Sequence, residues 1–326
     1  MRDYETLYAG FQGVTGGKKI AIIGAGAVGG YYGARLAEAG HKVHFLVRRD
    51  YHAVTANGLK VTSPDGDFVL TDPRIAKNSE EIGPADWVIC ALKSSSLHDA
   101  HKLVQPCAGP GTRILVLMNG LGLEEHFANW FGAGRVFGGL AFTCINRGKP
   151  GYIHHLAYGT VTIGHFQDSP QELETGLSLW SGSRVTILPA ISLLRARWEK
   201  LCWNIPFSGL CVAAGGITTD RIMQDPGLHA AALNLMEEVI AAGNADLEFH
   251  GGDLRIDRDS MIDSMFARTS TMGAYRPSTM IDYVEGRAME IEYMFAEPLR
   301  RAESLGLQSL YLTLLTTLLH SLNTGR

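Results

Sequence analysis

The chain has 326 residues, of which 46% are hydrophobic and 19% charged, and its formal net charge is -4. This balance is typical of a soluble globular protein with about two domains. It lacks the basic stripe of a nucleic-acid binder, and no apolar run reaches the roughly 18 residues of a membrane span. We therefore expect neither nucleic acid nor a membrane as a partner.

Signals for cross-linking, metal binding and targeting are weak. The cysteines are odd in number, widely spread and never in C-x-x-C spacing, so neither a disulfide framework nor a metal site is expected. A reducing cytoplasm fits this usage best. Residues 1–17 have no long apolar run and carry acidic side chains, which predicts a flexible N-terminal extension rather than a secretory signal.

The first structured segment predicts a dinucleotide-binding unit. An apolar strand over 19–23 leads into a glycine-rich turn, a helix over 27–39 and a second strand over 43–47. In this fingerprint the first glycine permits a tight turn, the second lets a pyrophosphate approach the backbone, and the third lets the helix pack on the strand. The residues of the turn are Gly24, Ala25, Gly26, Ala27, Val28 and Gly29.

The residues after the second strand indicate which nucleotide binds. NAD sites usually place an acid there to accept hydrogen bonds from the ribose, whereas an arginine accommodates a 2′-phosphate. This chain has Arg48 and Arg49, which favours NADP(H), although Asp50 follows at once. Two solvated arginines at a strand end are the alternative interpretation.

The remaining N-terminal pattern predicts a doubly wound α/β sheet. A hairpin is expected around Ser63–Gly66, and apolar strands over 87–92 and 113–118 end at Lys93 and Asn119, where open sheets bind their ligands. Further strands are expected over 136–144, 161–164 and 184–188, with a glycine-rich turn between the first two.

From residue 191 onward the spacing predicts helices, interrupted at residues 215–216, 251–252 and 306. The expected architecture is an N-terminal Rossmann-type domain over 18–190 and an all-helical substrate domain over 191–326. The chemistry is expected where the two domains meet.

The first helix of the second domain offers a polar face at a spacing of four: Ala196, Lys200, Asn204 and Ser208. Lys200 is the ionisable group on this face and is a candidate proton donor, although spacing alone fits an ordinary surface lysine as well. Pro206 is expected to disturb the helix. Another helix is expected to open at Arg287 and to carry Glu290 and Glu292, which fit either a substrate contact or a solvated face.

Several of these pieces together resemble the ketopantoate reductase family from Lys18 onward. The matching pieces are the glycine turn, Arg48, Ala91-Leu92-Lys93, Met118-Asn119-Gly120, Trp198-Glu199-Lys200-Leu201 with Asn204, and Ser278 with Met289-Glu290-Ile291-Glu292.

The resemblance implies a role for each matching residue. Lys200 would be the catalytic lysine and Glu290 would bind substrate, while Asn119, Asn204 and Ser278 would surround substrate and nicotinamide. Cofactor contacts would come from the glycine turn, Leu92, Asn119 and, at the adenosine end, Arg48 and Lys93.

The chain departs from the family pattern at two substrate positions. Ser208 stands where a second asparagine is common, and Tyr275 stands where an asparagine often precedes the serine. We therefore expect NADPH-dependent reduction of a 2-oxo acid, with ketopantoate to pantoate as the leading case and a homodimer as a possible assembly. The alternatives are a reductase of the same fold for another 2-oxo acid or a polyol phosphate, and a non-catalytic NADP sensor.

Overall fold

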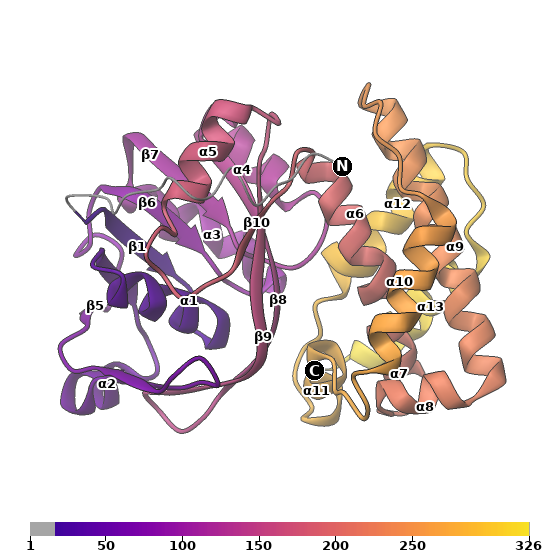
Figure 1. Ribbon diagram of the computed structural model, residues 1–326, viewed down its shortest axis with the longest axis horizontal. Coiled ribbons are helices and arrows are strands. Elements are labelled where there is room, and N and C mark those ends of the chain that lie inside the picture. Colours follow the sequence, from indigo (N-terminus) through magenta and orange to yellow (C-terminus); the bar gives the residue numbers. More distant parts are fainter. Residues whose placement is uncertain (1–16, 326) are drawn as a thin grey trace. The chain divides into compact units, whose positions relative to one another are not determined.

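The computed structural model describes residues 17–325, so the predicted extension lies outside the described residues except for Gly17. The chain forms two compact units, shown in Figure 1. The first contains the residues up to Met118 together with Glu124–Leu193, and the second contains Asn119–Leu123 and Leu194–Arg326. The first unit is a mixed sheet with helices and the second is helical, which confirms the predicted fold class.

The sheet of the first unit has the strand order β4-β3-β9-β8-β7-β6-β1-β2-β5, with β10 beside β9. The strands from β5 to β8 pair in parallel, whereas β8 with β9 and β3 with β4 are antiparallel. The strands are β1 (Lys19–Ile23), β2 (Lys42–Leu46), β3 (Leu59–Thr62), β4 (Phe68–Leu70), β5 (Arg74–Ala76), β6 (Ala85–Cys90), β7 (Ala108–Val116), β8 (Val136–Arg147), β9 (Tyr152–His165) and β10 (Ile187–Pro189).

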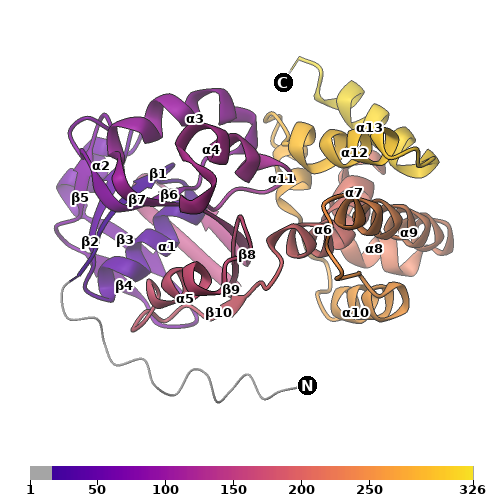
Figure 2. The ribbon, with the colours of Figure 1, turned by 90° about the horizontal axis from the view of Figure 1, so that it is seen from above.

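Helices cover both faces of this sheet. Figure 2 shows α1 (Ala27–Glu38) and α5 (Pro170–Ser178) on one face and α3 (Leu97–Val104) and α4 (Leu123–Phe131) on the other. The short α2 (Tyr51–Asn57) follows β2. Because β1 and β6 are enclosed on both faces, their side chains are almost entirely apolar, as expected for buried parallel strands.

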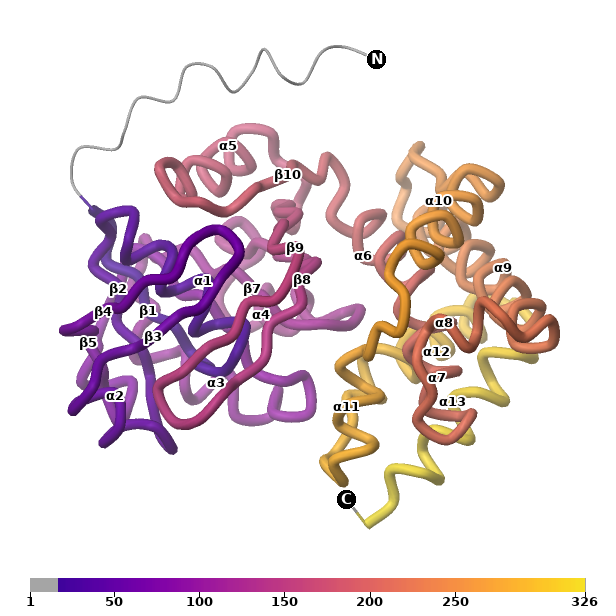
Figure 3. Tube along the Cα trace, turned by 60° about the horizontal axis from the view of Figure 1, so that its bottom comes forward, coloured from indigo at the N-terminus to yellow at the C-terminus, as the bar shows by residue number. Residues whose placement is uncertain are grey.

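The long hairpin of β8 and β9 differs from the expectation. Figure 3 traces the two strands side by side, and they pair from Phe137 with His165 to Arg147 with Ile153. The glycine-rich turn is confined to residues 148–151, and β9 begins nine residues before the predicted strand. Its first half alternates buried and more exposed residues because it belongs to an antiparallel pair. Histidines and tyrosines interrupt the apolar run there, so the sequence pattern did not predict this half of the strand.

The second unit is built around one interrupted helix. The helix α6 (Leu193–Trp203) continues through a π-helical turn (Asn204–Ser208) into α7 (Gly209–Ala213), and the predicted disturbance at Pro206 is confirmed. The other helices are α8 (Thr219–Gln224), α9 (Pro226–Phe249), α10 (Arg258–Ser270), α11 (Ser278–Val284), a second π-helical turn (Glu292–Ala296), α12 (Glu297–Ser304) and α13 (Leu310–Asn323).

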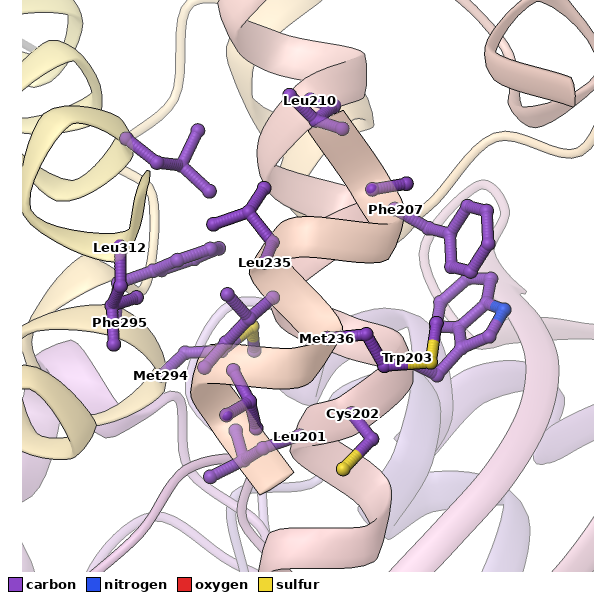
Figure 4. Packing of buried hydrophobic residues seen from close by; sticks show 14 of the residues in the cluster. Leu201, Cys202, Trp203, Phe207, Leu210, Leu235, Met236, Met294, Phe295 and Leu312 are labelled. Carbon is purple, nitrogen blue, oxygen red and sulfur yellow. The ribbon is translucent and has the colours of Figure 1, made fainter. Parts of the chain in front are cut away.

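The core of this unit forms where the interrupted helix meets α9, the second π-helical turn and α13. Figure 4 shows Trp203 stacked on Phe207, and Met294 and Phe295 lying close to Leu235 of α9. The predicted breaks at residues 215–216, 251–252 and 306 are all present. Among the described residues, no helix is long and apolar enough to cross a membrane.

The helix expected to open at Arg287 is a wrong prediction, because residues 287–290 are not helical and the helical run begins at Ile291. Tertiary partners hold this segment in place. The Arg287 guanidinium donates to Asp282 at 2.8 Å, and the Met289 N–H donates to the Asn323 side chain at 2.9 Å. The second of these bonds satisfies a backbone N–H that a helix would otherwise pair within itself.

Candidate active site

Each glycine of the β1–α1 turn has its own structural reason. Gly24 has φ +98°, and a Cβ there would lie 2.7 Å from the Ala91 carbonyl. A Cβ on Gly29 would lie 2.3 Å from the Gly24 oxygen. At Gly26 a Cβ would meet nothing within 4 Å, so the backbone there is open to an approaching group. This open position at the start of α1 fits the pyrophosphate of a dinucleotide.

The strand order places this turn at a topological switch point. From β1 the chain moves first to β2 on one side and later to β6 on the other, with Ile22 paired to both Phe45 and Ile89. Open α/β sheets bind ligands in the crevice at the carboxyl ends of such strands. Arg48 follows β2 and Leu92 and Lys93 follow β6, so the structure brings these predicted cofactor residues to the same edge as the glycine turn.

The carboxylate of Asp50, which follows the two arginines, is paired with another side chain. Arg48 and Arg49 are exposed, whereas Asp50 is buried and only 8% exposed. The carboxylate of Asp50 forms an ion pair with Arg147 from the end of β8, with the Arg147 Nε 3.1 Å from Oδ2. Sequence reasoning missed Arg147, because a single arginine in a hairpin has no local signal.

The predicted catalytic lysine lies beside the predicted asparagine. The Lys200 ammonium, on α6, donates a hydrogen bond to the Asn119 side-chain oxygen at 2.7 Å. Both residues belong to the second unit, although Asn119 follows β7 in the sequence. The loop is fixed there because the Leu121 N–H donates to the Tyr293 carbonyl at 2.8 Å.

The packing under this loop is tight. A Cβ on Gly120 would lie 2.6 Å from the Cβ of Tyr293, so the loop rests directly on the second π-helical turn. Burial, followed by the charges of Glu292 and Glu297, raises the pKa of Tyr293. Its phenol therefore stays protonated and neutral around pH 7.

The polar face that begins at Lys200 changes direction at the π-helical turn. Lys200 and Asn204 are half-buried, but Ser208 is only 3% exposed. A π-helical turn bonds residue i to i+5 instead of i+4, so the residues after it are rotated relative to a continuous α-helix. Lys200 and Asn204 therefore remain at the rim of the unit, whereas Ser208 points into its interior.

The remaining predicted residues lie around this turn on other elements. Ser278 is exposed at the first position of α11, and α11 packs against both α7 and the first π-helical turn. Glu290 is half-buried just before the second π-helical turn, which packs against the first. Glu292 is exposed and pairs with Arg300 at 2.8 Å, so the structure separates the two candidate carboxylates.

A Rossmann-type nucleotide domain followed by a helical unit with a lysine–asparagine pair defines a class, the pyridine-nucleotide-dependent oxidoreductases. The family described as "Ketopantoate reductase PanE/ApbA" matches residues 20–168, and its C-terminal domain matches residues 192–323. The chain belongs to the ketopantoate reductase family. It is thus an oxidoreductase that acts on CH–OH groups and takes a small-molecule substrate.

Similar proteins support this assignment along nearly the whole chain. A 2-dehydropantoate 2-reductase from Nostoc is 38% identical over 298 residues, covering 89% of this chain and 90% of its own. The crystal structure of a 2-dehydropantoate 2-reductase from Geobacter metallireducens has a TM-score of 0.89 at 42% identity, covering 93% and 99%. A D-mandelate dehydrogenase in complex with NADH and anilino(oxo)acetate has a TM-score of 0.83 and covers 94% and 98%, but at 21% identity it shares the fold alone.

Proposed function

We propose that this protein reduces a 2-oxo acid to a 2-hydroxy acid with NADPH, and that ketopantoate, giving pantoate, is its leading substrate. The observation that carries the proposal is the hydrogen bond from Lys200 to Asn119. It joins the predicted proton donor to the residue that follows β7, a strand whose carboxyl end belongs to the nucleotide-binding edge of the sheet.

The first unit would hold the cofactor. The open backbone at Gly26 suits the pyrophosphate, and Arg48 and Lys93 flank the glycine turn at the adenosine end. When bound, NADPH supplies the two electrons of the reduction at its nicotinamide. The proposal requires a state of the protein in which the nicotinamide and Lys200 meet at the substrate carbonyl.

The second unit would bind and protonate the substrate. Lys200 would donate a hydrogen bond to the keto oxygen and then a proton as that oxygen becomes an alkoxide. Asn119 holds the ammonium in position, and Asn204, one turn further along, would contact the substrate. Ser278 would bind the substrate carboxylate and Glu290 its hydroxyl group. Ser208 would shape the pocket from beneath, because its side chain is buried.

One observation keeps a second substrate in consideration. The Tyr275 ring packs against Trp203 with centroids 5.9 Å apart, and Trp203 itself stacks on Phe207 beside the first π-helical turn. An aromatic group therefore borders the residues that would contact substrate. The second candidate is accordingly reduction of another 2-oxo acid, or of the oxidised form of a polyol phosphate, by the same residues.

The experiment is steady-state turnover of NADPH with ketopantoate, for the wild type and for Lys200→Ala. A general acid contributes about 10²- to 10⁴-fold, so kcat should fall by that amount while NADPH binding is unchanged. Arg195→Ala is the matched control, because Arg195 lies on the same helix but pairs with Glu199 at 2.7 Å. Unchanged turnover in Lys200→Ala would remove Lys200 from the mechanism.

A panel of carbonyl substrates separates the remaining possibilities. Turnover of ketopantoate above other acids supports the leading case, and turnover of a different acid alone supports the second candidate. Tight NADPH binding without oxidation across the whole panel would instead identify a sensor. The Lys200–Asn119 pair argues against that outcome, because a protein that merely binds the nucleotide needs no positioned proton donor.

We also propose that the protein is a cytoplasmic homodimer. Its five cysteines are free thiols, as a reducing compartment leaves them. Burial raises the pKa of Cys90 and of Cys211 to about 12, so neither thiol is reactive near neutral pH. The surface that favours a dimer lies on α13, where Leu310, Leu314 and Leu318 remain exposed.

A further inference from the structure

The residues that follow β2 favour two different cofactors. Two arginines that suit a 2′-phosphate are followed at once by Asp50, and an acid in this region of a Rossmann domain usually accepts hydrogen bonds from the ribose of NAD. A free carboxylate there would repel a phosphate. Asp50 is also buried, and a buried charge is costly unless it is paired.

Arg147 resolves the contradiction. Its Nε lies 3.1 Å from Oδ2 of Asp50, and its terminal nitrogen contacts Oδ1, so the guanidinium holds both carboxylate oxygens. The Gly151 N–H donates to Oδ2 as well, at 3.3 Å. The charge of Asp50 is thereby compensated and Oδ2 accepts two hydrogen bonds, so the carboxylate is poorly placed to accept from ribose hydroxyls.

The ion pair is part of a pocket that begins at the glycine turn. An open pocket is lined by Gly26, Asp50 and Arg147, with apolar walls that include Val47 and Ile153. Arg147 offers five N–H groups in a planar fork; its Nε–H donates to Asp50, and a terminal nitrogen forms the ion-pair contact with Oδ1. The side chain remains about one-third exposed, so it is accessible from the pocket to a bound ligand.

We propose that Arg147 is a specificity-determining residue for the cofactor: it compensates the negative charge of Asp50, two residues after Arg48, so that the phosphorylated ribose of NADP(H) is preferred over that of NAD(H). This inference rests on the proposed function, because it concerns the same nucleotide site. Arg147 differs from Arg48 in its place in the chain, because it comes from the β8–β9 hairpin, nearly a hundred residues later.

The test measures the dissociation constants of NADPH and NADH separately, without substrate, for the wild type, Arg147→Gln and Asp50→Asn/Arg147→Gln. Removing Arg147 exposes the Asp50 charge, so NADPH should bind roughly tenfold or more weakly while NADH binds equally well or better. Removing the charge of Asp50 as well should restore part of the NADPH affinity. Arg147→Lys should give an intermediate value, because it keeps the charge but loses the fork.

Arg113→Gln is the matched control. Arg113 holds Glu172 with the same two-point geometry, at 2.7 and 3.1 Å, in the same unit but outside the pocket. This variant should leave the NADPH to NADH preference unchanged. The thermal unfolding temperature of each variant reports whether it is folded. An equal effect of Arg147→Gln on both nucleotides, or no effect on either, would overturn the inference while leaving the proposed reduction intact. A wild type that binds neither nucleotide would overturn both.

Discussion

Arg48 follows β2 and is exposed at the edge of the sheet where the glycine turn lies, and we propose that its guanidinium binds the 2′-phosphate of NADP(H). Its neighbour Arg49 is also exposed but lies one residue further from the end of β2. The two arginines are the same residue type, and they differ in their distance from the end of the strand.

Replacing Arg48 with alanine should weaken NADPH selectively. The loss of a charge-assisted hydrogen bond, worth about 1.5–3 kcal/mol, corresponds to a KM for NADPH raised roughly tenfold to hundredfold, with the KM for NADH little changed. Steady-state kinetics with each nucleotide measures this change. Arg49→Ala is the control and should have the smaller effect. Equal effects of the two substitutions would show that general positive charge, not a placed guanidinium, selects the cofactor.

At the scale of elements, the loop after β7 is the feature that matters most for the site. Asn119–Leu123 follows a strand of the first unit but packs as part of the second. Two contacts keep it there: the hydrogen bond from Leu121 to the Tyr293 carbonyl, and the close approach of Gly120 to Tyr293. The position of the amide that holds Lys200 therefore depends on a glycine with φ +124°.

Gly120→Ala should lower both kcat and the free energy of unfolding, whereas the same substitution at a glycine with open space around it should affect stability alone. The Cβ at position 120 would overlap the Tyr293 backbone and displace Asn119 from Lys200, and a misplacement of about 1 Å at a reacting group costs roughly 10²-fold in rate. Gly132→Ala is the matched control, because Gly132 also has a positive φ but its Cβ would meet nothing within 4 Å. It should cost about 1–3 kcal/mol of unfolding free energy with kcat retained. Similar losses of kcat in both variants would contradict the positioning role.

At the scale of the whole molecule, α13 has a surface unlike that of an ordinary solvated helix. It carries no Asp, Glu, Lys or Arg, and Leu310, Leu314 and Leu318 are 73%, 60% and 43% exposed on successive turns. In a two-fold dimer the same patch of each subunit packs against its copy, and a continuous apolar stripe on one helix suits such packing. A second copy of the chain is therefore the occupant we expect.

Leu314→Lys should convert the dimer to a monomer, because it places a charge at the centre of the stripe. Light scattering coupled to gel filtration measures the mass. His320→Lys adds the same charge to an exposed position on another side of the helix and should leave the dimer intact. A wild type that is monomeric at high concentration would exclude this assembly.

The sequence could predict much of this fold because its strongest signals are local. A strand, a glycine turn and a helix are specified by neighbouring residues: Gly24 has the positive φ of a tight turn, Gly29 allows the close packing of the helix, and the backbone at Gly26 is open. The buried parallel strands were visible as apolar runs. The half-exposed start of β9 was not, because polar side chains on its outer face broke the run.

The sequence alone determined the nucleotide-binding unit, the helical second half and the candidate lysine, since each rests on spacing within a short stretch of chain. Tertiary structure alone decided that Lys200 contacts Asn119, that Ser208 is buried while Asn204 is not, and that Arg147 neutralises Asp50. The two contacts are between residues far apart in the chain, and the burial of Ser208 depends on the extra residue of the first π-helical turn. Local spacing contains no information about such long-range packing, because it is set by how the elements fill space together.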